Sequence, residues 1–118
     1  MDVLTRGINQ FSERLNAGLQ CVEVPEWPDE DGSNTKIYFK PSLNLKQQQK
    51  ILELSSKNLV VEAIAQTLIL RALDENGKPL FNQANMNEIM RQLDPDVVSR
   101  IVSAMNAEDL TDDVIEKN

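Results

Sequence analysis

The sequence predicts a mainly helical α+β domain, with an N-terminal helix, a small β-hairpin and then a bundle of about four helices. Three observations support this prediction. Apolar residues recur at helical spacing in several segments, two short stretches before residue 41 alternate apolar and polar residues, and turn-forming residues separate the segments. A chain of 118 residues has room for one hydrophobic core.

One helix and one hairpin are predicted in the first 40 residues. Four large apolar residues fall on one stripe of a helix over residues 2–18, namely Leu4, Ile8, Phe11 and Leu15. The segments 19–25 and 35–40 are short and rich in β-branched or aromatic residues, which is typical of strands. The acidic segment 26–34 is therefore predicted to be a hairpin loop. Cys21, in the first strand, is expected to be a small buried or half-buried residue.

Four helices are predicted in the rest of the chain, over residues 45–55, 59–73, 84–93 and from 95 onward. The first begins with Asn44 and Gln47 in a capping-box relation. The last begins with Asp94, a capping residue, followed by Pro95 at the first helical position. The segment 59–73 is apolar over most of its circumference, so it must be covered on several sides. In so small a chain, a second subunit is one source of that cover.

The end of the chain differs in composition from the body. The last twelve residues, 107–118, contain five acidic residues and one Lys. Such a segment buries too little apolar surface to offset the cost of ordering it. We therefore predict a single folded domain over residues 1–106 and a flexible acidic tail over residues 107–118.

Composition argues against catalysis and against nucleic-acid binding. The chain has no His and one Cys, which excludes the usual zinc sites and Cys/His nucleophile pairs. The acidic loop has Asn34 and Lys40 where a calcium-binding EF-hand needs Gly and Glu. A net charge of −7 with dispersed basic residues is unsuited to a phosphate backbone. We predict no catalytic residue, no metal site and no cofactor.

The sequence also argues against a membrane location. No apolar stretch is long enough to span a bilayer, and the N-terminus has no signal-peptide pattern. We therefore expect a cytoplasmic protein that binds other proteins.

Five apolar residues are candidate protein-binding residues, namely Trp27, Met86, Met90, Met105 and Leu110. Trp27 is either a lid on the core or an exposed anchor, because Trp is enriched at binding hot spots. The methionines lie on the apolar faces of the last two helices, where they either fill the core or provide an adaptable surface. Leu110 belongs to an acidic segment that is either solvated or becomes ordered on a basic partner.

Two segments resemble a known family. Residues 22–51 resemble the hairpin-then-helix opening of tail assembly chaperones from long-tailed bacteriophages and prophages. Residues 69–106 are similar to the helix, the D-x-x-G-x-x-L-F turn and the paired helices of the same family. The resemblance covers residues 20–106, and its matching residues are Val24, Pro25, Trp27, Tyr38, Pro41, Asp74, Gly77, Leu80, Phe81, Leu93 and Asn106.

The resemblance implies a specific function. Proteins of this family are not enzymes: they coat the tape measure protein during tail assembly and recruit tail tube subunits. Several self-associate, many also exist in a longer frameshifted form, and they are absent from the finished virion. On this basis we expect a tail assembly chaperone in the host cytoplasm, in a tail-assembly-chaperone-like domain over residues 1–106.

Two alternatives remain open at this stage. One is another acidic protein-interaction module, such as an inhibitor or a nucleic-acid mimic, which would carry its carboxylates on one rigid face. The other is a carboxylate-dependent enzyme, which would need a deep pocket with two acids or an acid and a Lys.

Overall fold

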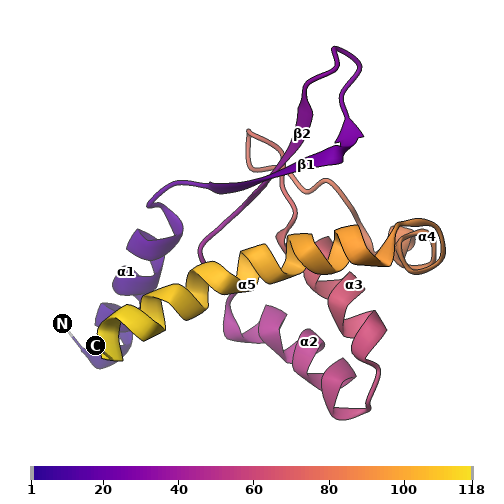
Figure 1. Cartoon of the computed structure of the whole chain (residues 1–118). Helices are drawn as coiled ribbons and strands as arrows, with labels where there is room; N and C mark the ends of the chain where they lie inside the picture. Colours follow the sequence, from indigo (N-terminus) through magenta and orange to yellow (C-terminus); the bar gives the residue numbers. More distant parts are fainter. Residues whose placement is uncertain (1, 118) are drawn as a thin grey trace.

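The predicted fold class is confirmed. The structure, a computed structural model, describes the backbone of residues 2–117 and the side chains of residues 2–106. A helix, a two-stranded antiparallel hairpin and further helices follow one another along the chain (Figure 1). The elements are α1 (Val3–Leu15), β1 (Gln20–Pro28), β2 (Asn34–Phe39), α2 (Leu45–Ser56), α3 (Val60–Arg71), the short 3-10 helix η1 (Gln83–Asn85), α4 (Met86–Gln92) and α5 (Pro95–Lys117).

The capping residues fix where the helices begin. At α2, the Asn44 side chain accepts from the Gln47 backbone N–H at 2.8 Å, and the Gln47 side chain accepts from the Asn44 backbone N–H at 3.1 Å. The predicted capping box is thus confirmed. At α5, the Asp94 carboxylate accepts from the backbone N–H of Asp96 at 2.9 Å, and Pro95 is the first helical residue.

Helix α5 is longer than the sequence predicted. We expected the last helix to end near Asn106, whereas its backbone remains helical to Lys117. No Gly or Pro follows Pro95, so the sequence contains no strong stop signal there. The flexibility expected for residues 107–118 stays a prediction.

The hairpin packs one of its faces against the helices. In β1, Val24 is buried and Val22 is half-buried, whereas Cys21 and Glu23 are exposed on the other face. The expectation that Cys21 is buried or half-buried is therefore wrong, because its position in the strand places it with Glu23 on the solvent side. In β2, Tyr38 exchanges two backbone hydrogen bonds with Leu73, at 2.9 and 2.8 Å. This exchange fixes the second strand to the end of α3.

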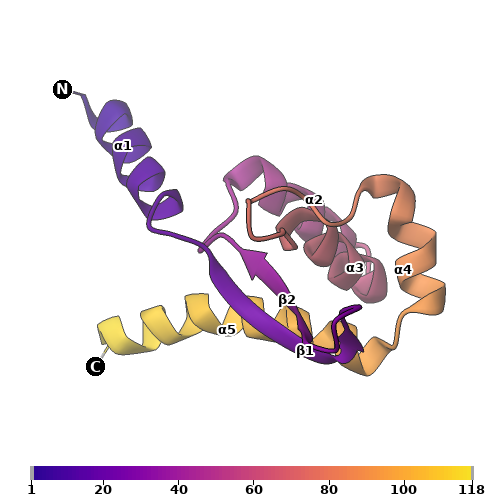
Figure 2. The same ribbon diagram turned by 90° about the horizontal axis from the view of Figure 1, so that it is seen from above.

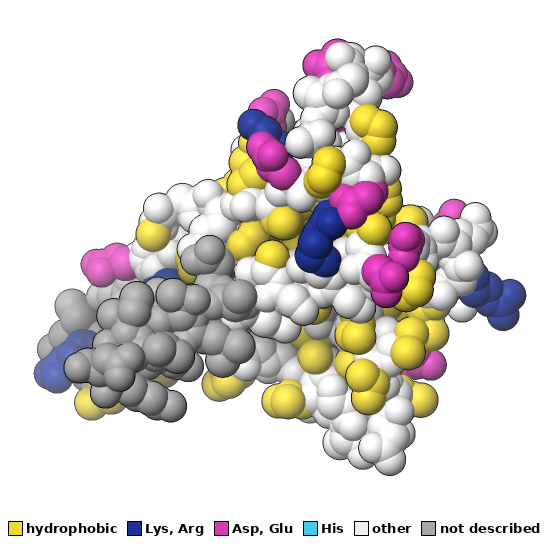
Figure 3. Space-filling view, in the orientation of Figure 1, with side chains coloured by type: hydrophobic (Ala, Val, Ile, Leu, Met, Phe, Trp, Pro, Cys, Tyr) yellow, Lys and Arg dark blue, Asp and Glu magenta, His cyan; other side chains and the backbone are white. Residues whose placement is uncertain are grey.

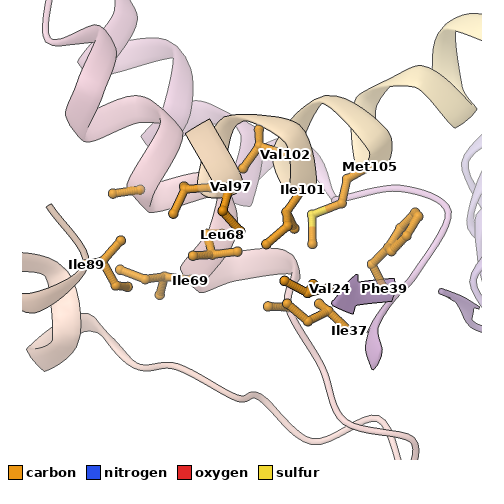
Figure 4. Close-up of a cluster of buried hydrophobic side chains, with 13 residues drawn as sticks. Val24, Ile37, Phe39, Leu68, Ile69, Ile89, Val97, Ile101, Val102 and Met105 are labelled. Atoms are coloured by element: carbon orange, nitrogen blue, oxygen red, sulfur yellow. The ribbon is translucent and has the colours of Figure 1, made fainter. Parts of the chain in front are cut away.

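The hydrophobic core lies where α3 meets the hairpin, α4 and α5 (Figure 4). Helix α3 provides Leu68 and Ile69, and the other elements surround them. The remaining large residues of the core are Val24, Ile37, Phe39, Ile89, Val97, Val98, Ile101, Val102 and Met105. The prediction that the apolar helix is covered on several sides is confirmed for all but its first turn.

One buried cation joins three elements near the end of α3. Arg71 is only 4% exposed, and its guanidinium lies 5.4 Å from the centre of the Phe39 ring. It donates to the Lys40 backbone carbonyl at 2.9 Å and to the Asn106 side-chain oxygen at 3.4 Å. The side chain thus connects α3 with the end of β2 and with α5.

A surface ion pair connects the hairpin to α5 on the other side of the core. The Arg100 guanidinium donates through both terminal nitrogens to the Glu26 carboxylate, one of them at 2.7 Å. This hydrogen bonding holds the pKa of Glu26 below its ordinary value and raises the pKa of Arg100. The pair lies beside the irregularity in β1 between Val24 and Pro28, and so restrains the hairpin where regular pairing stops.

We predict that Arg71→Ala lowers the free energy of unfolding by about 2–4 kcal/mol. The substitution opens a cavity and removes the side chain that donates a hydrogen bond to the Lys40 carbonyl. Arg71→Lys keeps the charge but loses the fork of donors, so a smaller loss is expected. Urea unfolding followed by Trp27 fluorescence measures both variants. A loss below about 0.5 kcal/mol for Arg71→Ala would contradict the assigned role.

We also predict that Glu26→Gln lowers the urea midpoint at neutral pH but not in acid. Because the pKa of Glu26 is lowered on folding, its stabilising effect is present above the unfolded pKa and is lost as the pH falls through the folded pKa. The two midpoints should therefore converge in acid, once the pH has fallen through the folded pKa of Glu26. Glu30→Gln, which removes an exposed carboxylate from the same hairpin, serves as the control and should leave the midpoint unchanged at neutral pH.

Candidate functional site

The structure places four of the five predicted binding residues in or against the hydrophobic core. Trp27 is half-buried and packs on the core, in agreement with its interpretation as a lid. Met86 and Met90 are half-buried and pack against the same core. Met105 is 0% exposed and fills the core, so it is not available as a binding residue in this chain. The reason is that the face of α5 that bears Met105 lies against α3 and the hairpin. Leu110 lies outside the described side chains.

A small apolar groove lies between α3, α4 and the start of α5. We call it the α3–α5 groove, and it has a volume of about 110 Å³. Its main lining residues are Val61, Ile64, Ile89, Met90, Leu93 and Val98. Of the predicted binding residues, Met90 is the one that lines it.

Exposed apolar residues extend the groove along the first turn of α3. Val60 and Val61 are 58% and 62% exposed, although the rest of α3 is largely buried. Apolar side chains gather where α3 begins and below α4 (Figure 3). Sequence reasoning missed these two valines as surface residues, although a segment 59–73 that is apolar over most of its circumference was the signal that could have found them.

A second apolar surface is formed by α1. We call it the α1 stripe: Val3, Leu4 and Ile8, which are 79%, 72% and 56% exposed. Figure 2 shows α1 pointing away from the rest of the chain, at the end of the molecule opposite α4. No residue of α1 is buried.

The α1 stripe borders an open hollow, and a turn at Gly18 follows α1. Together with Leu43 and Leu45 at the start of α2, it lines a hollow of about 590 Å³. The chain leaves α1 through Gly18, whose φ of +111° is readily adopted by glycine and rarely by other residues. The predicted helical stripe is thus present, but it does not face the core of its own chain.

The α3–α5 groove and the α1 hollow have charged residues of different sign near them. Glu62, Asp94 and Asp96 are neighbours in sequence of the groove residues Val61 and Pro95. Helix α2, whose first turn lines the α1 hollow, instead bears the exposed cations Lys46 and Lys50. A partner of either surface would therefore meet a different local charge.

The described part of the chain contains neither a metal-binding cluster nor a membrane-spanning helix. Among residues 2–106, no cluster of three or more Cys, Asp or Glu side chains is arranged to hold a metal ion. Within the same range, no helix combines the length and the apolar character needed to cross a membrane. Apolar surfaces are the features here that suit a binding role.

The arrangement of a projecting helix, a hairpin and helices around a buried α3 is shared with a bacteriophage tail assembly chaperone of known structure. The chain is similar to the solved structure of the bacteriophage HK97 tail assembly chaperone, with 20% identity and a TM-score of 0.59. The match covers 86% of this chain and 91% of the HK97 chain. No protein-family model and no curated protein sequence matches the chain.

The structural match confirms the family resemblance at the level of the fold. At 20% identity it shows that the two chains fold alike over most of their length. It includes more of this chain than the residues that carried the resemblance in sequence, because 86% of 118 residues is more than the span 20–106.

Truncations of two isoleucines should distinguish the α1 stripe from the core. We predict that Ile8→Ala changes the free energy of unfolding by less than about 0.5 kcal/mol, because Ile8 is mostly exposed. Ile37→Ala, the same truncation at a residue 1% exposed, should cost about 2–4 kcal/mol. Urea unfolding at low protein concentration measures both. Equal losses would show that α1 belongs to the core.

Proposed function

We propose that this protein is a non-enzymatic tail assembly chaperone that binds the tape measure protein of its phage and helps to recruit tail tube subunits. The observation that supports the proposal is the fold, which matches the HK97 tail assembly chaperone over most of both chains. The sequence resemblance over residues 20–106 points to the same family. On this proposal the protein acts in the host cytoplasm and is absent from the mature virion.

The two apolar surfaces suit this role. A tape measure protein is a long helical chain whose apolar faces must be kept from aggregating before the tail is built. The α3–α5 groove and the exposed valines beside it offer an apolar surface that a helix can cover. Trp27, Met86 and Met90 lie at or near the surface of the same body and are further candidate contacts.

We assign self-association to the α1 stripe. A stripe of large apolar residues that its own chain leaves exposed is stabilised when another surface removes it from water. The stripe and the α3–α5 groove lie at opposite ends of the molecule (Figure 2), so contact between copies at one end leaves the other end open to a partner. Several copies could then line one elongated tape measure protein.

Co-expression tests the proposal. We expect the tape measure protein encoded with this chain to remain soluble when both are produced together, and to elute with the chain as one complex on size exclusion. Without the chain, the same tape measure protein should aggregate. If it stays insoluble in both cases and no complex elutes, the proposed function is wrong.

A further inference from the structure

We propose that the α3–α5 groove receives one large apolar side chain of a partner helix, and that Lys or Arg residues flank this side chain in the partner. The inference rests on the proposed function, because it assigns the tape measure protein to this groove. It goes further by stating which surface is used and which chemistry that surface selects.

The size of the groove sets what can enter it. Its volume is about 110 Å³. An engineered protein cavity of about 150 Å³ holds benzene, which has six carbon atoms, so this groove has room for one side chain of the size of Leu, Ile or Met. Two such side chains would not fit.

The groove combines a fixed floor with adaptable walls. Ile89 and Val98 are buried members of the core, so packing holds them in place. Met90 and Leu93 are only partly buried, and methionine adjusts its shape readily to different neighbours. An apolar side chain that enters would therefore meet a preformed floor, which lowers the cost of binding, and walls that can adjust to its shape.

The exposed valines make a helix the natural form of the partner. Val60 and Val61 continue the apolar surface beyond the groove along the first turn of α3. A partner helix presents apolar residues three or four positions apart on one face. One of them can occupy the groove while the next lies on the valines, which is the usual way in which an amphipathic helix binds a groove.

The charges beside the groove are mainly negative. Glu62 follows Val61, and the exposed Asp94 and Asp96 flank Pro95. Among the nearby cations, Arg100 is paired with Glu26, and Arg91 lies exposed on α4. Glu88, also on α4, adds a further negative charge. The described charges next to the lining residues are therefore mainly negative, and they favour a partner that bears Lys or Arg around its apolar anchor.

A matched pair of substitutions tests the groove. Val61→Lys removes apolar surface at its edge and adds a positive charge, whereas Leu52→Lys makes the same kind of change on α2, outside the groove. Val61 and Leu52 are 62% and 64% exposed, so both variants should fold with similar urea midpoints.

Two designed peptides provide the probe. Both are helices of about 18 residues with the same Leu positions, and they differ in having Lys or Glu on either side of the apolar face. Fluorescence anisotropy should show that the Lys peptide binds the unmodified chain about tenfold more tightly than the Glu peptide, with an affinity that falls as salt rises. Val61→Lys should weaken binding of the Lys peptide about tenfold, and Leu52→Lys should stay within about twofold of the unmodified chain.

Several outcomes would overturn the inference. It fails if the Glu peptide binds as tightly as the Lys peptide, if Val61→Lys binds like Leu52→Lys, or if neither peptide binds at concentrations up to about 1 mM. Co-expression with the tape measure protein separates this failure from failure of the proposed function. A complex that forms equally well with Val61→Lys overturns the groove alone, whereas no complex with the unmodified chain overturns the proposed function.

Discussion

The fold depends on the need to cover α3. This helix is apolar around almost its whole circumference, so the hairpin, α2, α4 and α5 must pack around it to remove it from water. The cover is complete in the middle of the helix, where Leu68 is fully buried, and incomplete at its start, where Val60 and Val61 remain exposed. The same property that forms the core therefore leaves an apolar edge at the surface. A core and an exposed apolar surface arise here from one helix, and they differ only in whether a neighbouring element of the chain reaches that turn.

Polar contacts then determine how the hairpin sits on this core. Apolar packing has little directional preference, whereas a buried guanidinium needs hydrogen-bond acceptors at defined positions. Arg71 meets that need with the Lys40 carbonyl and Asn106, and the Tyr38–Leu73 hydrogen bonds act next to it. On the opposite side, Glu26 and Arg100 hold the outer part of β1 against α5. The hairpin is thus fixed at two points on either side of the hydrophobic cluster, which keeps Trp27 on the core.

Local signals made most of the fold predictable, and only tertiary packing could decide the rest. The Asn44–Gln47 capping box and the Asp94-Pro95 start are encoded within a few residues, so the helix starts follow from the sequence. The α1 stripe is equally clear as a pattern, but an amphipathic helix has the same spacing whether it faces its own core or a partner. For the same reason Met90 and Met105 cannot be told apart by periodicity. Their different exposure depends on how α4 and α5 are placed against α3, which involves residues distant in sequence.

The net charge of −7 is a poor guide to what this protein binds, because the charges are not spread evenly. At physiological ionic strength, exposed charges more than about 8 Å apart are largely screened from one another. A partner helix in the α3–α5 groove therefore interacts chiefly with the nearby Glu62, Asp94 and Asp96. A partner at the α1 hollow instead meets the lysines of α2, which follow one side of that helix. Since the two surfaces lie at opposite ends and differ in local charge, they favour different partners and need not compete. Under the proposed function, this separation would let the protein hold one partner while it contacts another.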